Sequence, residues 1–291
     1  MNMLPAPIEA FAAEAAGRVQ DVIDRSWPRN SSNVWELVGD TGQHFYLKQH
    51  SSSRFHTREV GAYQRWTARL GPGRAPVLLA ADADLQAMVV TALPGQPARD
   101  RQVPAATEAE IHRQVGVLLR RLHGVAPPAD SRQGASRVVA RVEDHICQAG
   151  RLLESAHVRL VREHAAQLEE MAGLIPAVPT HGDAQPRNFL WNAPGGRVAL
   201  IDFERAEVAP AVRDLVRLEY GPWDGRPDLR LSFLAGYGRT LTGPEQAALR
   251  SYAALDALSG LVWGSANNDQ DVLGRAHRTL ARLSVAGLRS V

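Results

Sequence analysis

The sequence predicts an α+β protein in which a small β-rich N-terminal region precedes a larger, mainly helical C-terminal region. Between residues 34 and 93, short apolar runs alternate with turn-forming residues. From residue 105 onward, apolar residues recur at the spacing of one helix face. Pro94-Gly95-Gln96-Pro97 interrupts both patterns. Strands followed by helices are typical of an α+β arrangement, which we expect to form two lobes.

The N-terminal elements follow from local patterns. Apolar residues at helical spacing predict an amphipathic helix over 8–25. Strands over 34–38 and 44–48 flank Gly39-Asp40-Thr41-Gly42, which is a hairpin turn signal. The remaining expected elements are a helix over 57–69 and strands over 77–81 and 87–93.

The C-terminal elements are predicted in the same way. Thr107 and Glu110 have the spacing of a capping box, and Thr242 and Glu245 repeat it. Expected helices cover about 137–156, 158–173, 227–239, 244–264 and 272–287, and short strands cover 189–191 and 198–201. We therefore expect an N-terminal lobe over 1–93, a linker over 94–104 and a helical lobe over 105–291.

Composition restricts the functional classes. The net charge is only +2 and no basic block stands out, so we expect no nucleic-acid partner. No apolar run approaches the roughly 18 residues of a membrane span, and residues 1–16 do not resemble a signal peptide, so the expected location is cytoplasmic. The single cysteine, Cys147, excludes an internal disulfide, and we expect it to pack in a helix.

The most informative segment is His181-Gly182-Asp183-Ala184-Gln185-Pro186-Arg187-Asn188, which Ile201-Asp202-Phe203-Glu204 follows. Phosphoryl transfer requires a carboxylate near the acceptor hydroxyl and oxygen ligands for Mg²⁺. Asp183, Asn188 and Asp202 are candidates for these functions.

The only lysine supports the same interpretation. Of the 33 basic residues 32 are arginine, and the remaining one is Lys48. An ammonium acts on phosphate as a compact point charge that a guanidinium does not reproduce. Lys48 ends the first hairpin, eleven residues before Glu59 on a predicted helix; an ordinary surface pair is the alternative.

These motifs resemble the aminoglycoside phosphotransferase family, which has the protein-kinase-like fold. The resemblance covers about residues 30–218 and includes Tyr46-Leu47-Lys48 and Leu93-Pro94-Gly95. It implies that Asp183 orients the acceptor hydroxyl and accepts its proton, and that Asn188 and Asp202 hold Mg²⁺.

The resemblance also implies a nucleotide site, for ATP or GTP. Lys48 would contact the α- and β-phosphates and pair with Glu59, while the backbone of Thr91, Ala92 and Leu93 would face the adenine. Asp214 would brace the catalytic loop, and His181 would be a packing residue of that loop.

Two departures from protein kinases are informative. No G-x-G-x-x-G precedes Lys48; Asn30-Ser31-Ser32-Asn33 is the candidate phosphate loop, and a plain hairpin turn is the alternative. Only eleven residues separate Asp202 from Asp214, which leaves no room for a peptide-binding activation segment and favours a small acceptor.

Arg187 is a candidate to stabilise the transferred phosphoryl group, or else forms a salt bridge within the loop.

The acceptor is less defined. Residues 181–291 hold 12 acidic residues and 13 arginines, which does not favour a polycationic aminoglycoside unless Asp224, Asp228, Asp256, Asp269 and Asp271 cluster. Trp263 and Trp223 are candidate stacking residues, with core packing as the alternative. Asp256 and Asn267 are further acceptor candidates.

The resulting prediction is an ATP- and Mg²⁺-dependent kinase, monomeric or homodimeric, that phosphorylates a hydroxyl of an antibiotic and so confers resistance or self-protection. The alternatives are a metabolic kinase for an amino alcohol, choline or a sugar, and a non-catalytic nucleotide-binding module.

Overall fold

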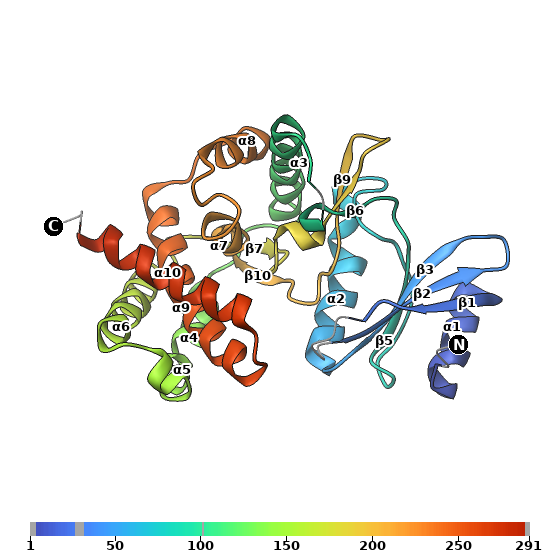
Figure 1. Ribbon diagram of the computed structural model, residues 1–291, viewed down its shortest axis with the longest axis horizontal. Coiled ribbons are helices and arrows are strands. Elements are labelled where there is room, and N and C mark those ends of the chain that lie inside the picture. The colour runs from blue at the N-terminus through green and yellow to red at the C-terminus, as the bar shows by residue number, and fades with distance from the viewer. Residues whose placement is uncertain (1–3, 27–31, 101, 289–291) are drawn as a thin grey trace.

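The N-terminal region is built on a five-stranded antiparallel sheet in the order β1-β2-β3-β5-β4 (Figure 1). The structure is a computed structural model that describes residues 4–26, 32–100 and 102–288. The strands are β1 (Val19–Asp24), β2 (Ser32–Gly39), β3 (His44–His50), β4 (Leu78–Asp82) and β5 (Ala87–Thr91). The predicted hairpin between β2 and β3 is confirmed, with the Gly39 N–H donating to the Gln43 carbonyl at 2.8 Å.

Two helices cover opposite faces of this sheet (Figure 1). Alternate strand residues point to opposite faces, and β5 shows the result. Val89 packs in a small core beneath α1 (Ala6–Ala16), whereas Met88 and Val90 belong to the larger core that includes α2 (Ser53–Arg65). The face that carries Met88 is therefore continuous with the core of the helical region.

The helix predicted over 8–25 is wrong in its second half. Helix α1 ends at Ala16, the following Gly17 has a φ of +76°, and β1 starts at Val19. Val19, Val22 and Ile23 are β-branched, and pairing with β2 satisfies their backbone groups. Tertiary pairing therefore overrides a pattern that is also compatible with a helix.

The C-terminal region is mainly helical. Its helices are α3 (Ala105–His123), α4 (Arg132–Val139), α5 (Val142–Ala149), α6 (Ser155–Glu170), α7 (Val216–Glu219), α8 (Pro227–Tyr237), α9 (Gly243–Ala266) and α10 (Gln270–Leu288). Helix α9 is the centre of this region, since it packs against α5, α6 and α10 (Figure 1).

Several local predictions need correction. The helix expected over 137–156 is two helices, α4 and α5. The Thr242–Glu245 capping box is confirmed, but Thr107 lies inside α3, which begins at Ala105 behind Pro104 without a side-chain cap. Cys147 is in a helix but is exposed rather than packed. The expected lobe boundaries at 93 and 105 fall between β5 and α3 and stay a prediction.

Two small sheets position the loops between them. Strand β7 (Ala177–Thr180) pairs with β10 (Glu207–Pro210), and β6 (Gln96–Pro97), β8 (Phe189–Asn192) and β9 (Arg197–Leu200) form the second sheet. Residues 181–188 connect β7 to β8, and residues 201–206 connect β9 to β10. The two predicted motifs therefore emerge side by side from paired strands.

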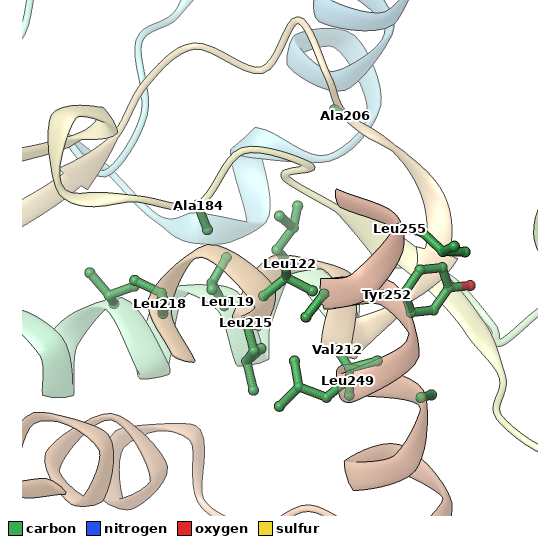
Figure 2. Packing of buried hydrophobic residues seen from close by; sticks show 14 of the residues in the cluster. Leu119, Leu122, Ala184, Ala206, Val212, Leu215, Leu218, Leu249, Tyr252 and Leu255 are labelled. Atoms are coloured by element: carbon green, nitrogen blue, oxygen red, sulfur yellow. The ribbon is translucent and has the colours of Figure 1, made fainter. Parts of the chain in front are cut away.

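The first of these loops is anchored to the hydrophobic core. Figure 2 shows Ala184 above Leu119 and Leu122 of α3, in a cluster that also contains Leu215 and Leu218. Ala184 is buried, and a larger residue there would meet a densely packed layer. Packing of Ala184 against the core therefore fixes the position of the backbone in the loop 181–188.

Candidate active site

Lys48 lies at the centre of three carboxylates contributed by distant parts of the chain. Its Nζ lies 2.8 Å from Glu59 of α2, 2.7 Å from Asp202 and 3.0 Å from Glu204. Burial alone would lower the pKa of Lys48, but the three carboxylates raise it well above its ordinary value. Lys48 therefore stays protonated. Its side chain is nearly buried, so it does not form an ordinary surface pair with Glu59.

The same carboxylates respond unequally to their surroundings. Burial opposes ionisation of Glu59, yet Lys48 and His50 hold its pKa below the ordinary range. The pKa of Glu204 lies above its ordinary value. Burial and the neighbouring Asp202 and Glu59 raise it, and they outweigh Lys48, which lowers it. His50, Glu59 and Glu204 place ligand atoms within 4.8 Å of one another, but the ammonium of Lys48 already supplies a cation to both carboxylates.

Asp202 has an unusual backbone. Its φ is +68°, in the left-handed region that aspartate tolerates better than most residues. Such conformations persist where the surroundings over-determine them, and they concentrate at functional sites. The neighbouring Phe203 N–H donates to Glu59 at 3.1 Å, which fixes this turn against α2.

Asp183 is buried among cations and amide groups. Arg187 donates to its Oδ2 at 2.8 Å, Gln185 donates to its Oδ1 at 2.6 Å, and Arg217 of α7 forms an ion pair with Oδ1. Burial alone would raise the pKa of Asp183, but Arg217 and Arg187 hold it well below its ordinary value. This carboxylate is a weak base with a fixed orientation, which suits positioning of a hydroxyl better than early proton removal.

Asp214 braces the loop that carries Asp183. Its Oδ1 accepts from the Gly182 N–H at 2.6 Å, and its Oδ2 accepts from the His181 N–H at 2.8 Å. His123 lies 3.0 Å from the same carboxylate through Nε2 and 2.8 Å from the Tyr237 hydroxyl through Nδ1. The implied structural role of Asp214 agrees with these contacts.

Gly182 is required by its geometry. Its φ is +77°, and a Cβ there would lie 2.1 Å from the carbonyl oxygen of Arg205. The side chain of His181 is buried and its Nε2 lies 3.0 Å from the Ile201 carbonyl, which ties the first motif to the second. His181 therefore lies in the loop as a packing residue.

Replacing Asp214 by Ala is expected to lower the free energy of unfolding by about 3–5 kcal/mol, because the His181 and Gly182 N–H groups and the buried His123 lose their partner. Urea denaturation measures this change. Asp144→Ala, an exposed position on α5, is the matched control and should shift the free energy by less than about 0.5 kcal/mol. A loss for Asp214→Ala no larger than that of the control would refute the bracing role.

Asn188 and Asp202, which are predicted to hold Mg²⁺, each have a side-chain oxygen that could bind the ion. The Nδ2 of Asn188 donates to the Asp183 carbonyl at 2.9 Å and to the Asp183 carboxylate at 3.1 Å, and its Oδ1 has no hydrogen bond to the described residues. Asp202 contacts Lys48 through Oδ1, so Oδ2 remains for a ligand. Carboxylate and amide oxygens are the ligands that Mg²⁺ prefers, so this donor set fits the ion.

The three residues predicted to face the adenine differ in whether their backbone N–H groups are free to bind it. The Thr91 N–H donates to Val77 at 2.9 Å and the Ala92 N–H donates to His44 at 3.1 Å, so both are used within the sheet. Among these three N–H groups, only that of Leu93 has no acceptor in the described residues. A hydrogen bond to a base is thus open to the Leu93 N–H.

The candidate phosphate loop is mostly strand or lies outside the described residues. Asn30 and Ser31 lie outside them, while Ser32 and Asn33 begin β2, in register with His50 and Gln49. Ser32 reaches Glu204 at 3.3 Å, beside the Lys48 cluster. Asn33 alternates to the opposite face and donates to Gln49, which argues against a phosphate contact by its side chain.

A cavity of about 1040 Å³ lies beside the catalytic loop, and Asp256, Trp263 and Asn267 all line it. Trp263 is 38% exposed, so it is not a core residue. Trp223 does not line the cavity: it is buried, donates to His112 at 3.1 Å and packs on Phe233. The prediction that Trp223 stacks on the acceptor is therefore wrong, because its apolar neighbours and His112 enclose it in the core.

The acidic cluster that an aminoglycoside site would need does not form. Asp256, Asp269 and Asp271 line the cavity, but Asp224 and Asp228 lie elsewhere, paired with Arg282 and Arg226.

Sequence reasoning missed three residues of the site. Arg217 contacts Asp183, Glu204 contacts Lys48, and Arg205 lies beside the catalytic loop. Glu204 and Arg205 adjoin Asp202 in the sequence, which was the available signal. Arg217 had none, because one arginine among 32 is not distinctive.

The family follows from a comparison over most of the chain. The model of the phosphotransferase enzyme family matches residues 25–252. The chain belongs to this family. The expected resemblance is thereby confirmed, and with it the interpretation as a small-molecule kinase.

Solved structures of similar fold support the bilobal kinase-like architecture. The GDP complex of aminoglycoside 2'-phosphotransferase-IIIa has a TM-score of 0.72 at 13% identity and covers 98% of this chain and 100% of its own. Macrolide 2'-phosphotransferase MphH from Brachybacterium faecium has a TM-score of 0.60 at 18% identity, with 95% and 98% covered. Spectinomycin phosphotransferase, solved with ADP and spectinomycin, has a TM-score of 0.64 at 13% identity, with 98% and 93% covered.

At these identities the structural matches show the fold alone. No curated protein sequence matches the chain. Among the helices of the described residues, none combines the length and the apolar character needed to cross a membrane.

Proposed function

We propose that this phosphotransferase transfers the γ-phosphoryl group of ATP to a hydroxyl of a small molecule, with Mg²⁺ as the metal. The observation that carries the proposal is the convergence of Lys48, Asp202 and the loop with Asp183 and Asn188 from three separate segments. This group adjoins the cavity, whose lining includes Gln185 and Glu204. Phosphoryl transfer depends on positioning and on neutralising charge, and this set supplies both.

Each residue has a defined task in this proposal. Lys48, held by Glu59, contacts the α- and β-phosphates, and the Leu93 N–H bonds to the adenine. Asn188 and Asp202 hold Mg²⁺, which neutralises phosphate charge when bound. Asp183 orients the acceptor oxygen and receives its proton as transfer proceeds, and the resulting products are ADP and a phosphate monoester.

Arg187 is proposed to stabilise the transferred phosphoryl group. Arg187→Ala should lower kcat about tenfold to hundredfold and change KM little, because Arg217 still holds Asp183 in place. Steady-state kinetics with ATP as the varied substrate measure this. Arg159→Ala, an exposed position on α6 away from the cavity, is the control. An unchanged kcat would leave Arg187 with only its salt bridge to Asp183.

Antibiotics are the first acceptors to test, because solved structures of the same fold carry names such as aminoglycoside, macrolide and spectinomycin phosphotransferase. Modification would inactivate the drug and so provide resistance or self-protection. A metabolic kinase is the second candidate. The arginines of the cavity favour a sugar as its acceptor over choline, an amino alcohol or a polycationic drug, because these carry positive charge.

An acceptor screen that measures ADP release tests the proposal. Kanamycin, spectinomycin, a macrolide, choline, a nucleoside and sugar phosphates are presented with ATP and Mg²⁺. We expect release that depends on one acceptor class and is lost in Asp183→Asn. Thermal stabilisation by ATP and Mg²⁺ without acceptor-dependent release would instead indicate a non-catalytic nucleotide-binding module.

A further inference from the structure

The cavity beside the catalytic loop is large and is distinct from the proposed nucleotide contacts. Its lining includes Gly182 and Gln185 of the catalytic loop, Trp263 of α9 and Asn267, which caps that helix. Lys48 and Leu93 do not line it. At about 1040 Å³ it is at the upper end of the range of ordinary ligand pockets, so it accommodates a drug-sized molecule.

The charge of this cavity is strongly positive. Ten arginines line it but only five carboxylates do, and it contains no lysine. The arginines come from both regions of the chain, since Arg54 and Arg58 lie on α2 whereas Arg275 lies on α10. A wall of this composition raises the local concentration of anions and repels cations.

The carboxylates of the cavity are largely neutralised by neighbours. Glu204 contacts Lys48, Glu207 contacts Arg58 and Arg213, and Asp256 lies 3.6 Å from Arg217. Asp269 accepts from the backbone N–H groups at the start of α10. Of the five carboxylates that line the cavity, only that of the exposed Asp271 has no such contact with the described residues, so little negative charge is left for a polycation.

Nine of the ten arginines divide into two groups. Arg58, Arg187, Arg213 and Arg217 form ion pairs with carboxylates. Five others have guanidinium groups without a hydrogen bond or ion pair to any described residue: Arg54, Arg137, Arg141, Arg205 and Arg275. These five guanidinium groups therefore have no direct partner in the described chain, although Asp183 and Asp256 attract Arg205 and Arg275 at longer range.

Arg205 gives a second, independent indication of a ligand. Its Nε is buried and has no hydrogen-bond partner in the described residues. Leaving a buried donor unsatisfied costs about 1–3 kcal/mol, and more for a charged group. Arg275 is partly buried; burial and the nearby Arg217 lower its pKa, although Asp256 opposes them. Both side chains are destabilising as they stand and would gain from an anionic partner.

We propose that the acceptor carries an anionic group, a carboxylate or a phosphate, in addition to the hydroxyl that is phosphorylated. This inference rests on the proposed function, because it describes the acceptor of that reaction. Guanidinium groups bind carboxylate and phosphate through two parallel hydrogen bonds, and Trp263 offers a flat surface for a ring. Polycationic aminoglycosides are excluded as preferred substrates by the same charges.

The nucleotide does not account for the whole set. Arg187 and Arg205 lie near Asp183 and are available to a transferred phosphoryl group. Arg137 lies on α4, Arg141 directly precedes α5 and Arg275 lies on α10, so these arginines line other parts of the cavity. The anionic group of the acceptor is accordingly assigned to these three.

Calorimetric binding to the full chain tests the inference. The protein is first saturated with Mg²⁺ and a non-hydrolysable ATP analogue, so that the triphosphate site is filled. It is then titrated with two matched sets of probes. The first set is glucose, glucose 6-phosphate and glucuronate, and the second is uridine and uridine 5'-monophosphate; kanamycin is the polycationic probe. We expect Kd to be at least about tenfold lower for an anionic member than for its neutral partner and for kanamycin. The two kinds of anion separate phosphate from carboxylate recognition. Equal binding across the panel, or its complete absence, overturns the inference.

Variants locate the anion site. Arg275→Gln and Arg141→Gln should each raise Kd for the preferred anion about tenfold and leave the neutral partner unchanged. Arg141 is exposed, so its variant tests the site even if Arg275→Gln fails to fold. Arg159→Gln is the matched control. Unchanged anion binding in both cavity variants overturns the assignment.

The two proposals fail differently. ADP release with only neutral or cationic acceptors would keep the kinase and overturn the anionic acceptor. Preferential anion binding without ADP release from any acceptor would keep the anion site and overturn the proposed reaction.

Discussion

Asp183→Asn is expected to lower kcat about 10²–10⁴-fold while nucleotide affinity stays within a few-fold of the parent. The carboxylate is fixed by Arg187, Arg217 and Gln185, so its two oxygens are already oriented before the acceptor enters. Asparagine keeps the shape but removes the oxygen that receives the hydroxyl proton. Steady-state ADP release with the acceptor identified in the screen measures the effect.

The control for this variant must separate chemistry from folding. An amide at position 183 also places donors against two guanidinium groups, so the unfolding midpoint and the Kd for ATP are measured alongside. Asp144→Asn on the exposed face of α5 is the matched substitution and should retain full activity. A kcat within tenfold of the parent in a folded Asp183→Asn protein would remove Asp183 from the reaction.

Lys48→Met is expected to lower kcat/KM for ATP about 10²–10³-fold. The side chain supplies the only cation within ion-pair distance of both Asp202 and Glu204 in the described residues. Its loss also leaves three carboxylates facing one another, which is expected to cost about 3–5 kcal/mol of the free energy of unfolding. Kinetics with ATP varied and urea denaturation measure the two effects separately.

Lys48→Arg keeps the charge and therefore isolates the geometry. The pocket around Lys48 is nearly closed, with the side chain 11% exposed, so a planar guanidinium cannot make all three contacts of the ammonium. We expect this variant to fold and to lose most of its ATP affinity. Full activity in Lys48→Arg would show that charge alone suffices, and a normal KM for ATP in Lys48→Met would contradict the phosphate contact.

The local part of the fold was predictable because it depends on near neighbours. The Gly39–Gly42 turn, the capping box at Thr242 and the helical spacing after residue 227 are each contained in a few residues. The strand Val19–Asp24 was not predictable in this way. Its residues fit both periods, and the choice was made by backbone pairing with β2.

The burial of a side chain was also not predictable from the local sequence, because it depends on residues from distant parts of the chain. Trp223 lies in the turn-like segment 221–225 and Trp263 follows the apolar Leu261-Val262, yet Trp223 is the one that is enclosed and Trp263 lines the cavity. What covers a side chain depends on residues far away in the chain. His112 of α3 encloses Trp223, 111 positions distant, and no local pattern contains that information.

The sequence by itself determined the chemistry of this protein: an Asp and an Asn in one loop, a second Asp after the next strand pair, and one lysine. Only the tertiary structure decided that Lys48 meets Asp202 across 154 positions and that Arg217 meets Asp183. It also decided the charge of the cavity. Acidic residues and arginines are nearly balanced over 181–291, and the lining residues from this range include five of each. The twofold excess of arginines in the lining comes from five arginines earlier in the chain: Arg54, Arg58, Arg99, Arg137 and Arg141. The reason is physical, because composition counts charges whereas folding pairs most carboxylates with partners and turns the remaining guanidinium groups toward the cavity.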